Sequence, residues 1–410
     1  MKIDITFEQA LAKASPRLRK QMEHTRDVIT KALPLALKYD KKGFWCGFSG
    51  GKDSQALYHM MQLCNAPMCV YFSPTSVDPP EVIRFIRKNY PEVEFTKLDK
   101  SIFEVFKQMR VLPSMKIRWC CAYFKEKGGE GKVVCTGVRK AESVRRSKRN
   151  EIEVSGRKFS GHMDEFEQWQ EKRIRKKVKN LNQDQFRDAK QTEVRCINGK
   201  DKILLNPILE WSDQDVWEFL NKVVEVPHCE LYDEGYTRIG CIGCPMATTK
   251  NQIKQFQRWP HVKEKWIQAI MDVRKEAILS STPPQVSVQQ RIRDWGGATN
   301  ISKVLPPDSQ NLRANTSGWV PQYTDSNGTF SNCKSGYWRN VPTWVTPQRN
   351  VDGKFLDSGN GDCSAVAAEY DEQKERAIAE AIFDWWISKK SFKQWFAETY
   401  QQRTLDLFDE

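Results

Sequence analysis

The sequence predicts an α/β fold built on a doubly wound parallel sheet. Short apolar runs alternate with amphipathic segments, and a glycine-rich turn separates the first run from the helix after it. Strands that alternate with helices form parallel sheets, because a parallel pair needs a long crossover connection. The expected strands are 43–48, 68–72, 93–98, 132–137 and 203–205, and the expected helices are 15–39, 54–63, 80–89, 101–109 and 213–223.

The chain of 410 residues is long for one compact domain, so additional parts are expected. The strand and helix pattern dissolves into charged sequence after residue 151, and residues 282–362 are rich in Pro, Gly, Ser and Asn. The predicted organisation is an N-terminal helical segment at 1–40, a main domain at 41–281 with a basic insertion or lid at 139–202, and an irregular appendage at 282–410 that ends in helices.

The hydrophobic residues form no run long enough to span a membrane, and the first residues lack the apolar stretch of a signal peptide. We therefore expect a cytoplasmic protein without a membrane partner. The twelve cysteines are then expected to be reduced, as packing residues, metal ligands or reactive thiols rather than disulfides.

Positive charge is concentrated in one segment. Residues 139–179 carry 14 Lys and Arg against 7 Asp and Glu, which accounts for more than half of the net charge of +13. Such a segment attracts polyanions, so DNA or RNA is a candidate partner. The alternative is a solvated lid over a phosphate ligand.

The glycine-rich turn is Ser49-Gly50-Gly51-Lys52-Asp53-Ser54. Adjacent glycines let backbone N–H groups approach a phosphate without Cβ clashes, and the N-terminus of the next helix adds positive potential. Lys52 supplies a mobile charge. The spacing is not that of the Walker loop, in which Lys is followed by Ser or Thr. The alternative to a phosphate site is an ordinary tight turn.

This turn resembles the PP-loop of the ATP pyrophosphatase superfamily. Further motifs resemble those of the phosphoadenosine phosphosulfate (PAPS) reductase family, and the resemblance spans residues 41–247. These motifs are Trp119-Cys120-Cys121, Thr136-Gly137-Val138-Arg139-Lys140-Ala141-Glu142-Ser143 with Arg146 nearby, the segment from Pro207 to Trp217, and Gly240-Cys241-Ile242-Gly243-Cys244-Pro245. The resemblance implies the fold of the adenine nucleotide alpha hydrolase-like proteins.

The resemblance also implies how an adenine nucleotide, either ATP or PAPS, is bound. The residues expected to contact it are Ser49, Gly50, Gly51, Lys52, Asp53, Ser54, Arg139 and Glu142. Those expected to carry the chemistry are Lys52, Asp53 and Arg139, with Asp53 as a ligand of Mg²⁺ if ATP is the substrate. For Arg139, Glu142 and Arg146 the alternative is a surface network of ion pairs.

Four cysteines supply enough thiolates for a 4Fe-4S cluster or a tetrahedral zinc ion: Cys120, Cys121, Cys241 and Cys244. The family resemblance favours the iron–sulfur cluster. Cys229 competes for one place, because adjacent cysteines bind one cluster only with local distortion of the backbone. The alternative is that these residues are buried structural thiols.

Reductases of this family are expected to carry a nucleophilic cysteine in a Glu-Cys-Gly motif near the C-terminus. Neither Cys333 nor Cys363 has that context. Some members use ATP instead, including proteins similar to the sulfur-transfer component of DNA phosphorothioation systems. We therefore predict an enzyme that cleaves ATP to pyrophosphate and transfers sulfur to nucleic acid, with a sulfur donor such as a cysteine desulfurase. The alternatives are a PAPS or adenosine phosphosulfate (APS) reductase and a non-catalytic nucleotide-binding or redox-sensing regulator.

Overall fold

The computed structural model describes residues 1, 3–154, 159–166, 168, 169, 172, 202–279, 370–391, 394, 395 and 398. Contacts divide the chain into two compact units. The first unit consists of Met1–Pro74, Asp78–Leu98 and Phe124–Gly240, and the second of Thr75–Val77, Asp99–Tyr123 and Cys241–Glu410. Each unit therefore contains segments that are distant in the sequence.

The first unit contains a sheet of seven strands among its described residues, in the order β3-β2-β1-β4-β7-β5-β6. The strands are β1 (Phe44–Gly47), β2 (Met68–Phe72), β3 (Glu94–Phe95), β4 (Val133–Cys135), β5 (Ile152–Val154), β6 (Phe159–Gly161) and β7 (Ile203–Leu205). The first four strands and β7 pair in parallel, whereas β5 pairs antiparallel with both β7 and β6. The predicted α/β fold with a parallel sheet is confirmed, with an antiparallel pair added at one edge.

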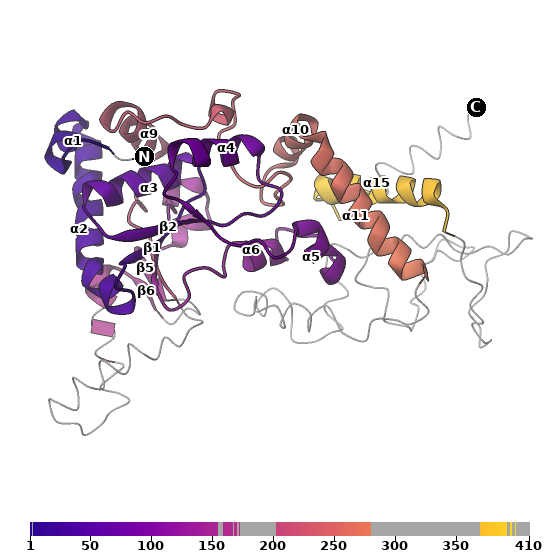
Figure 1. Cartoon of the computed structure of the whole chain (residues 1–410), viewed down its shortest axis with the longest axis horizontal. Coiled ribbons are helices and arrows are strands. Elements are labelled where there is room, and N and C mark those ends of the chain that lie inside the picture. The colour runs from indigo at the N-terminus through magenta and orange to yellow at the C-terminus, as the bar shows by residue number, and fades with distance from the viewer. Residues whose placement is uncertain are drawn as a thin grey trace, which may run out of the picture. The chain divides into compact units, whose positions relative to one another are not determined.

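Helices of this unit flank the sheet (Figure 1). They are α1 (Phe7–Lys13), α2 (Pro16–Tyr39), α3 (Lys52–Leu63), α4 (Pro80–Asn89) and α9 (Asp213–Glu218). The side chain of Ser15 caps α2 by accepting from the Leu18 N–H, and Pro16 occupies the first helical position, where it costs no hydrogen bond. Helix α2 packs against β1 and β4, so its apolar face closes one side of the core.

Parallel pairing places the carboxyl ends of β1 and β4 next to each other. Cys46 of β1 is in register with Cys135 of β4, and both side chains are buried. The chain leaves β1 into the glycine-rich loop and leaves β4 toward Arg139. Ligands of such sheets bind beyond the carboxyl ends of the strands, so this edge is where a functional site is expected.

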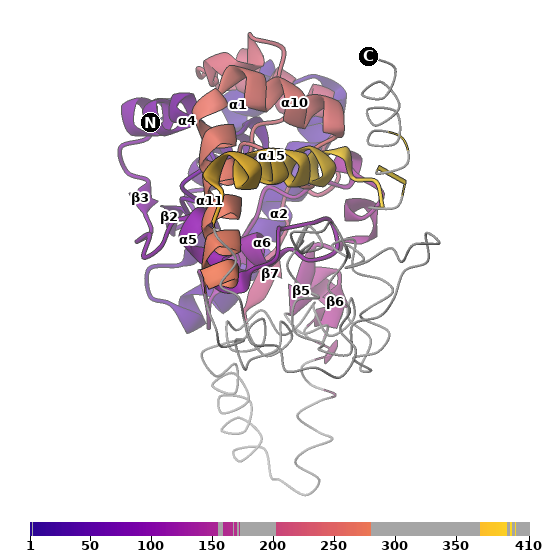
Figure 2. The same cartoon turned by 90° about the vertical axis from the view of Figure 1, so that its right-hand side faces the viewer.

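The second unit is helical in its described part. It contains α5 (Ile102–Met109), α6 (Trp119–Phe124), α10 (Thr249–Arg258), α11 (Pro260–Leu279) and α15 (Glu372–Ser388). Helix α15 packs against α11, as both views show (Figure 1 and Figure 2). The ring centroids of Trp386 and Trp266 are 5.0 Å apart. Arg274 of α11 pairs with Glu375 of α15, and both side chains are buried.

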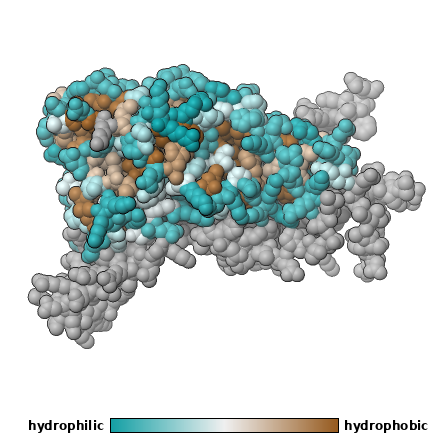
Figure 3. Space-filling model, viewed as in Figure 1, coloured by the Kyte–Doolittle hydropathy of each residue, from teal (hydrophilic) through white to brown (hydrophobic). Residues whose placement is uncertain are grey.

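The described surface is largely hydrophilic on the face shown in Figure 3, with smaller hydrophobic patches. Among the described residues, no helix is both long enough and apolar enough to cross a membrane.

Candidate functional site

The glycine-rich loop connects β1 to α3 and is held by its own serines. The Ser54 hydroxyl donates to the Gly51 carbonyl at 2.8 Å and accepts from the Ser49 N–H at 3.2 Å. Gly50 has a φ of +72°, and a Cβ there would lie 3.0 Å from side-chain carbons of Val82 and Ile86. The turn therefore requires glycine at position 50 for both its backbone conformation and its packing.

The loop and the start of α3 carry backbone donors without a protein partner in the described part of the chain. Among the residues that the structure describes, no acceptor is paired with the N–H groups of Gly50, Asp53 or Ser54. These groups belong to the loop and to the first turn of α3, where the helix dipole favours an anion. The Lys52 N–H donates to the Tyr232 hydroxyl at 2.8 Å, and burial raises the pKa of Tyr232. The tyrosine thus reaches the start of α3 as a neutral group.

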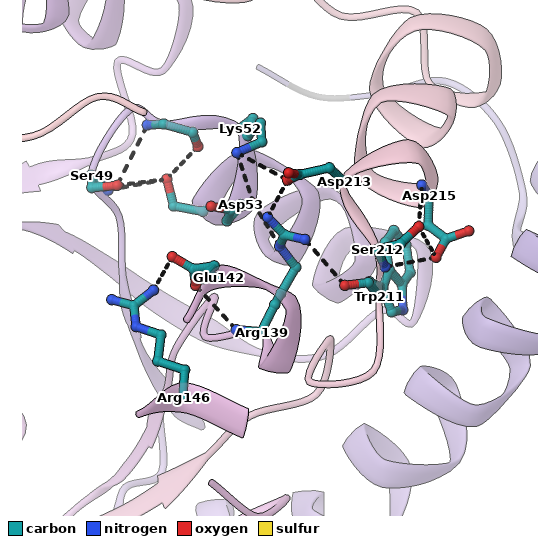
Figure 4. A network of polar contacts seen from close by, with 12 residues as sticks. Ser49, Lys52, Asp53, Arg139, Glu142, Arg146, Trp211, Ser212, Asp213 and Asp215 are labelled. Carbon is teal, nitrogen blue, oxygen red and sulfur yellow. Dashed lines mark hydrogen bonds and ion pairs between the residues drawn. The ribbon is translucent and has the colours of Figure 1, made fainter. Parts of the chain in front are cut away.

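Arg139 follows β4 and lies next to the glycine-rich loop (Figure 4). At Gly137, a Cβ would lie 2.8 Å from the Asp53 carbonyl oxygen, so the two loops are in close contact. The Arg139 guanidinium donates to Asp53 Oδ1 at 2.8 Å, to the Trp211 carbonyl at 3.1 Å and to Asp213 Oδ1 at 2.6 Å. Each of its three nitrogens therefore donates once, which uses three of its five N–H groups.

Lys52 and Arg139 form a pair of buried cations. The Lys52 ammonium lies 3.6 Å from Asp53 Oδ1 and 3.3 Å from Asp213 Oδ1. Burial raises the pKa of Asp53, although Lys52 and Arg139 act against this shift. Burial also acts on Asp213, but the Arg139 hydrogen bond and the Lys52 charge outweigh it and lower the pKa of Asp213. Two positive and two negative side chains therefore balance one another beside the loop.

Glu142 and Arg146 extend this network. Glu142 accepts from the Arg139 N–H at 3.1 Å and pairs with the Arg146 guanidinium (Figure 4). Burial lowers the pKa of Arg146, and the positive charge of Arg238 acts in the same direction while Glu142 opposes it. The Arg139 side chain is only 1% exposed. A surface network of ion pairs therefore does not describe Arg139.

Two residues of the site had no role in the sequence analysis. Asp213 starts α9, and Tyr232 ends the 3-10 turn Glu230–Tyr232. Asp213 lies within the Pro207 to Trp217 segment that resembles the family. This resemblance indicated that the segment is important, but it did not predict the contacts of Asp213. Nothing in the local sequence of Tyr232 indicates that its hydroxyl meets α3.

The four candidate ligand cysteines all belong to the second unit. A hydrogen bond with Cys121, burial and the charges of the Cys121, Cys241 and Cys244 thiols raise the pKa of Cys120, so Cys120 lies near the other three cysteines. Thr75 Oγ1 lies 3.5 Å from Cys241 Sγ. Within the described ranges, no group of three or more His, Cys, Asp or Glu side chains is arranged to hold a metal ion. The metal remains a prediction.

The remaining candidate cysteines and most of the basic segment lie elsewhere in the chain. Cys229 is buried in the first unit, where its thiol accepts from the Leu231 N–H and has Glu230, Glu81 and Glu234 as its charged neighbours. Cys333 and Cys363 lie outside the described residues, as does most of the basic segment beyond residue 172.

Comparison with known proteins assigns the chain to a family. The model of the phosphoadenosine phosphosulfate reductase domain matches residues 43–247, which is half of the chain. The chain belongs to the PAPS reductase family. The matched range includes the glycine-rich loop, Arg139, Asp213 and all four candidate ligand cysteines.

Several curated relatives of this PAPS reductase family member are 24% identical. An uncharacterised protein of Methanocaldococcus jannaschii matches over 65% of this chain and 59% of its own length. A second protein of that organism matches over 55% of this chain and 41% of its own length, so the chain spans less than two thirds of either. An adenosine 5'-phosphosulfate reductase of Pseudomonas aeruginosa matches over 55% of this chain and 75% of its own length.

Solved structures resemble the chain more remotely. Candida glabrata FMN adenylyltransferase in complex with FAD and inorganic pyrophosphate has a TM-score of 0.36 and 16% identity, covering 58% of this chain and 68% of that one. Yeast FAD synthetase in complex with FAD has a TM-score of 0.32 and 15% identity, covering 57% of this chain and 73% of that one.

Proposed function

We propose that the protein is an enzyme that binds ATP at the glycine-rich loop and cleaves it between the α and β phosphates. The observation that carries the proposal is the pair of buried cations, Lys52 and Arg139, beside N–H groups at the start of α3 that have no acceptor among the described residues. Such an arrangement suits a polyphosphate, because phosphate chemistry depends mainly on positioning and charge stabilisation.

The residues of the site have complementary roles in this reaction. The loop N–H groups bind phosphate oxygens, and Lys52 and Arg139 stabilise the negative charge that develops on them. An acceptor oxygen attacks the α phosphorus, and pyrophosphate leaves with the electrons of the broken P–O bond. The carboxylate of Asp53 would hold Mg²⁺, which supplies further charge neutralisation when bound.

The wider function that we propose is sulfur transfer to nucleic acid. ATP cleavage would activate the acceptor, a donor such as a cysteine desulfurase would supply sulfur, and the basic segment that begins at Arg139 would bind the polyanion. Cys120, Cys121, Cys241 and Cys244 would hold a 4Fe-4S cluster, and the proximity of Cys120 to the other three cysteines supports this assignment.

Reduction of a sulfonucleotide is the second candidate, because relatives of this chain include proteins named adenosine 5'-phosphosulfate reductases. That reaction needs a thiolate that attacks the sulfonucleotide and releases the nucleotide phosphate. Cys333 and Cys363 lack the sequence context expected of this thiolate. For this reason we favour ATP as the substrate.

Product analysis distinguishes the two candidates. Protein purified without oxygen is incubated separately with ATP and Mg²⁺, and with PAPS or APS plus thioredoxin, while pyrophosphate, AMP and sulfite are measured. We expect pyrophosphate from ATP and no sulfite. Sulfite release that is lost in Cys333→Ser or Cys363→Ser would overturn the proposal in favour of the reductase.

A further inference from the structure

Asp213 holds both buried cations through a single oxygen. Its Oδ1 lies 2.6 Å from Arg139 Nη2 and 3.3 Å from Lys52 Nζ (Figure 4). The Asp213 side chain is 68% exposed, whereas those of Arg139 and Lys52 are 1% and 7% exposed. The carboxylate therefore lies on the solvent side of two cations that are otherwise enclosed.

A phosphate oxygen could accept hydrogen bonds from Lys52 and Arg139, as the Asp213 carboxylate does. Charge-assisted hydrogen bonds from Lys and Arg are the usual means of binding phosphate. A carboxylate and a phosphate also repel each other, so both cannot occupy one place next to Lys52 and Arg139. In the structure described here, Asp213 supplies the negative charge that a ligand would otherwise supply.

The fold does not depend on the Asp213 side chain. Helix α9 is capped by Ser212, whose hydroxyl accepts from the Asp215 N–H at 3.2 Å, while Asp215 Oδ2 accepts from the Ser212 N–H at 2.7 Å. Without Asp213, Arg139 keeps its bonds to Asp53 Oδ1 and to the Trp211 carbonyl. The Asp213 carboxylate can therefore leave the cations without loss of the helix or of the buried guanidinium's other partners.

We propose that Asp213 is a specificity residue, whose carboxylate occupies the place of a nucleotide phosphate and is displaced when the ligand binds. The inference rests on the proposed function, because it needs a phosphate ligand at the loop. A ligand must displace the Asp213 carboxylate from Lys52 and Arg139 before it can bind them. This displacement favours ligands that carry several phosphate charges. A weakly charged anion gains too little from these two cations to displace the carboxylate.

Removal of this carboxylate is expected to strengthen ligand binding. The probes are ATP and inorganic tripolyphosphate, titrated calorimetrically into the full chain in EDTA, which keeps divalent cations out of the comparison. We expect Asp213→Asn and Asp213→Ser to bind both probes at least about fivefold more tightly than the unaltered protein, because the competing charged hydrogen bonds are gone.

Asp233→Asn is the matched control. It removes one negative charge of similar exposure, 70% against 68%, from a carboxylate whose partner is His228 instead of the loop cations. This variant is expected to change affinity by less than about twofold, because the Asp233 carboxylate pairs with His228 and with neither Lys52 nor Arg139. Circular dichroism and thermal melting establish that each variant is folded, and the serine variant provides a second test if the asparagine variant is not.

The outcomes separate this inference from the proposed function. If the unaltered protein binds ATP but the Asp213 variants bind it equally or more weakly, the inference is wrong and the ATP site stands. The same holds if Asp233→Asn tightens binding as much as Asp213→Asn. If no form of the protein binds either probe, in EDTA or with Mg²⁺ restored, the ATP site itself is wrong and the inference fails with it.

Discussion

Gly50 illustrates what a single residue contributes to the loop. Its φ of +72° and its contact with Val82 and Ile86 leave no room for a side chain, whereas Gly51 has a φ of −85° and its nearest neighbours are the Tyr232 and Ser49 hydroxyls at 3.3 and 3.4 Å. We predict that Gly50→Ala lowers the free energy of unfolding by about 1–3 kcal/mol. Gly51→Ala is expected to lower it by less. Urea denaturation measures both, and equal losses would contradict the structure.

At Arg139 the planar shape of the guanidinium is expected to matter as well as its charge. Lysine preserves the charge but cannot donate to Asp53, Asp213 and the Trp211 carbonyl through one planar fork. Arg139→Lys is therefore expected to weaken ATP binding by about tenfold or more, since a factor of ten corresponds to about 1.4 kcal/mol. The control is Lys140→Arg at the neighbouring, half-exposed pair with Glu210. Unchanged affinity in Arg139→Lys would show that the fork is unimportant.

Some residues of the candidate site could be predicted from the sequence and others could not. The glycine-rich loop is a local motif, since its chemistry follows from adjacent residues, and the structure brings it to Arg139 through the ion pair with Asp53. Asp213 and Tyr232 meet Arg139 and Lys52 across 74 and 180 residues. Only the folded chain determines such contacts, so no local pattern predicts them.

At the level of elements, His24 of α2 connects that helix to the start of β5. His24 Nε2 lies 2.9 Å from Glu151 Oε1, and this hydrogen bond raises the pKa of His24 above its ordinary value of 6.5. Because the pKa of His24 is higher in the folded state, protonated His24 stabilises the fold, and this contribution is fully present below the ordinary pKa of 6.5. It is lost as the pH rises through the raised pKa of the folded state. Glu151 has a lowered pKa, because its bonds to His24 and His162 outweigh burial, so its contribution is lost in acid below 4.5.

We therefore predict that His24→Gln destabilises the protein more at pH 6 than at pH 9. The expected difference in melting temperature is about 1–3 °C, because a partly exposed pair contributes little. Melting curves at the two pH values measure it, with His261→Gln as the control at an exposed histidine in α11. A deficit that is equal at both pH values would assign His24 a packing role instead.

The elements themselves were predicted unevenly. Residues 68–72 and 80–89 form a strand and a helix with the predicted bounds, because an apolar run and an amphipathic pattern that begins at a proline are strong signals. Strands β5 and β6 were missed, since the charged stretch after residue 151 was interpreted as an insertion without strands. Three residues are too few for an alternating pattern. Strand β5 forms by pairing with β7, and β6 by pairing with β5.

At the scale of the whole molecule, the uneven distribution of charge makes a separate prediction. If the basic segment binds nucleic acid, the logarithm of the binding constant should fall linearly with the logarithm of the salt concentration. The slope should steepen by about 0.9 for each phosphate contacted on a duplex. Replacing Arg145, Lys148, Arg173 and Lys176 with Ser should reduce this slope. Fluorescence anisotropy with labelled DNA and RNA measures it. Absence of binding at low salt would favour the lid over the nucleotide.

The central claim is that ATP is cleaved between its α and β phosphates at Lys52 and Arg139. Phosphorus NMR of ATP and Mg²⁺ incubated with the oxygen-free protein tests it most directly, because the spectrum identifies which bond breaks. We predict signals of AMP, or of an adenylated acceptor, together with pyrophosphate, and none of these in Lys52→Ala. Signals of ADP and phosphate, or an unchanged ATP spectrum alongside sulfite production from PAPS, would contradict the claim.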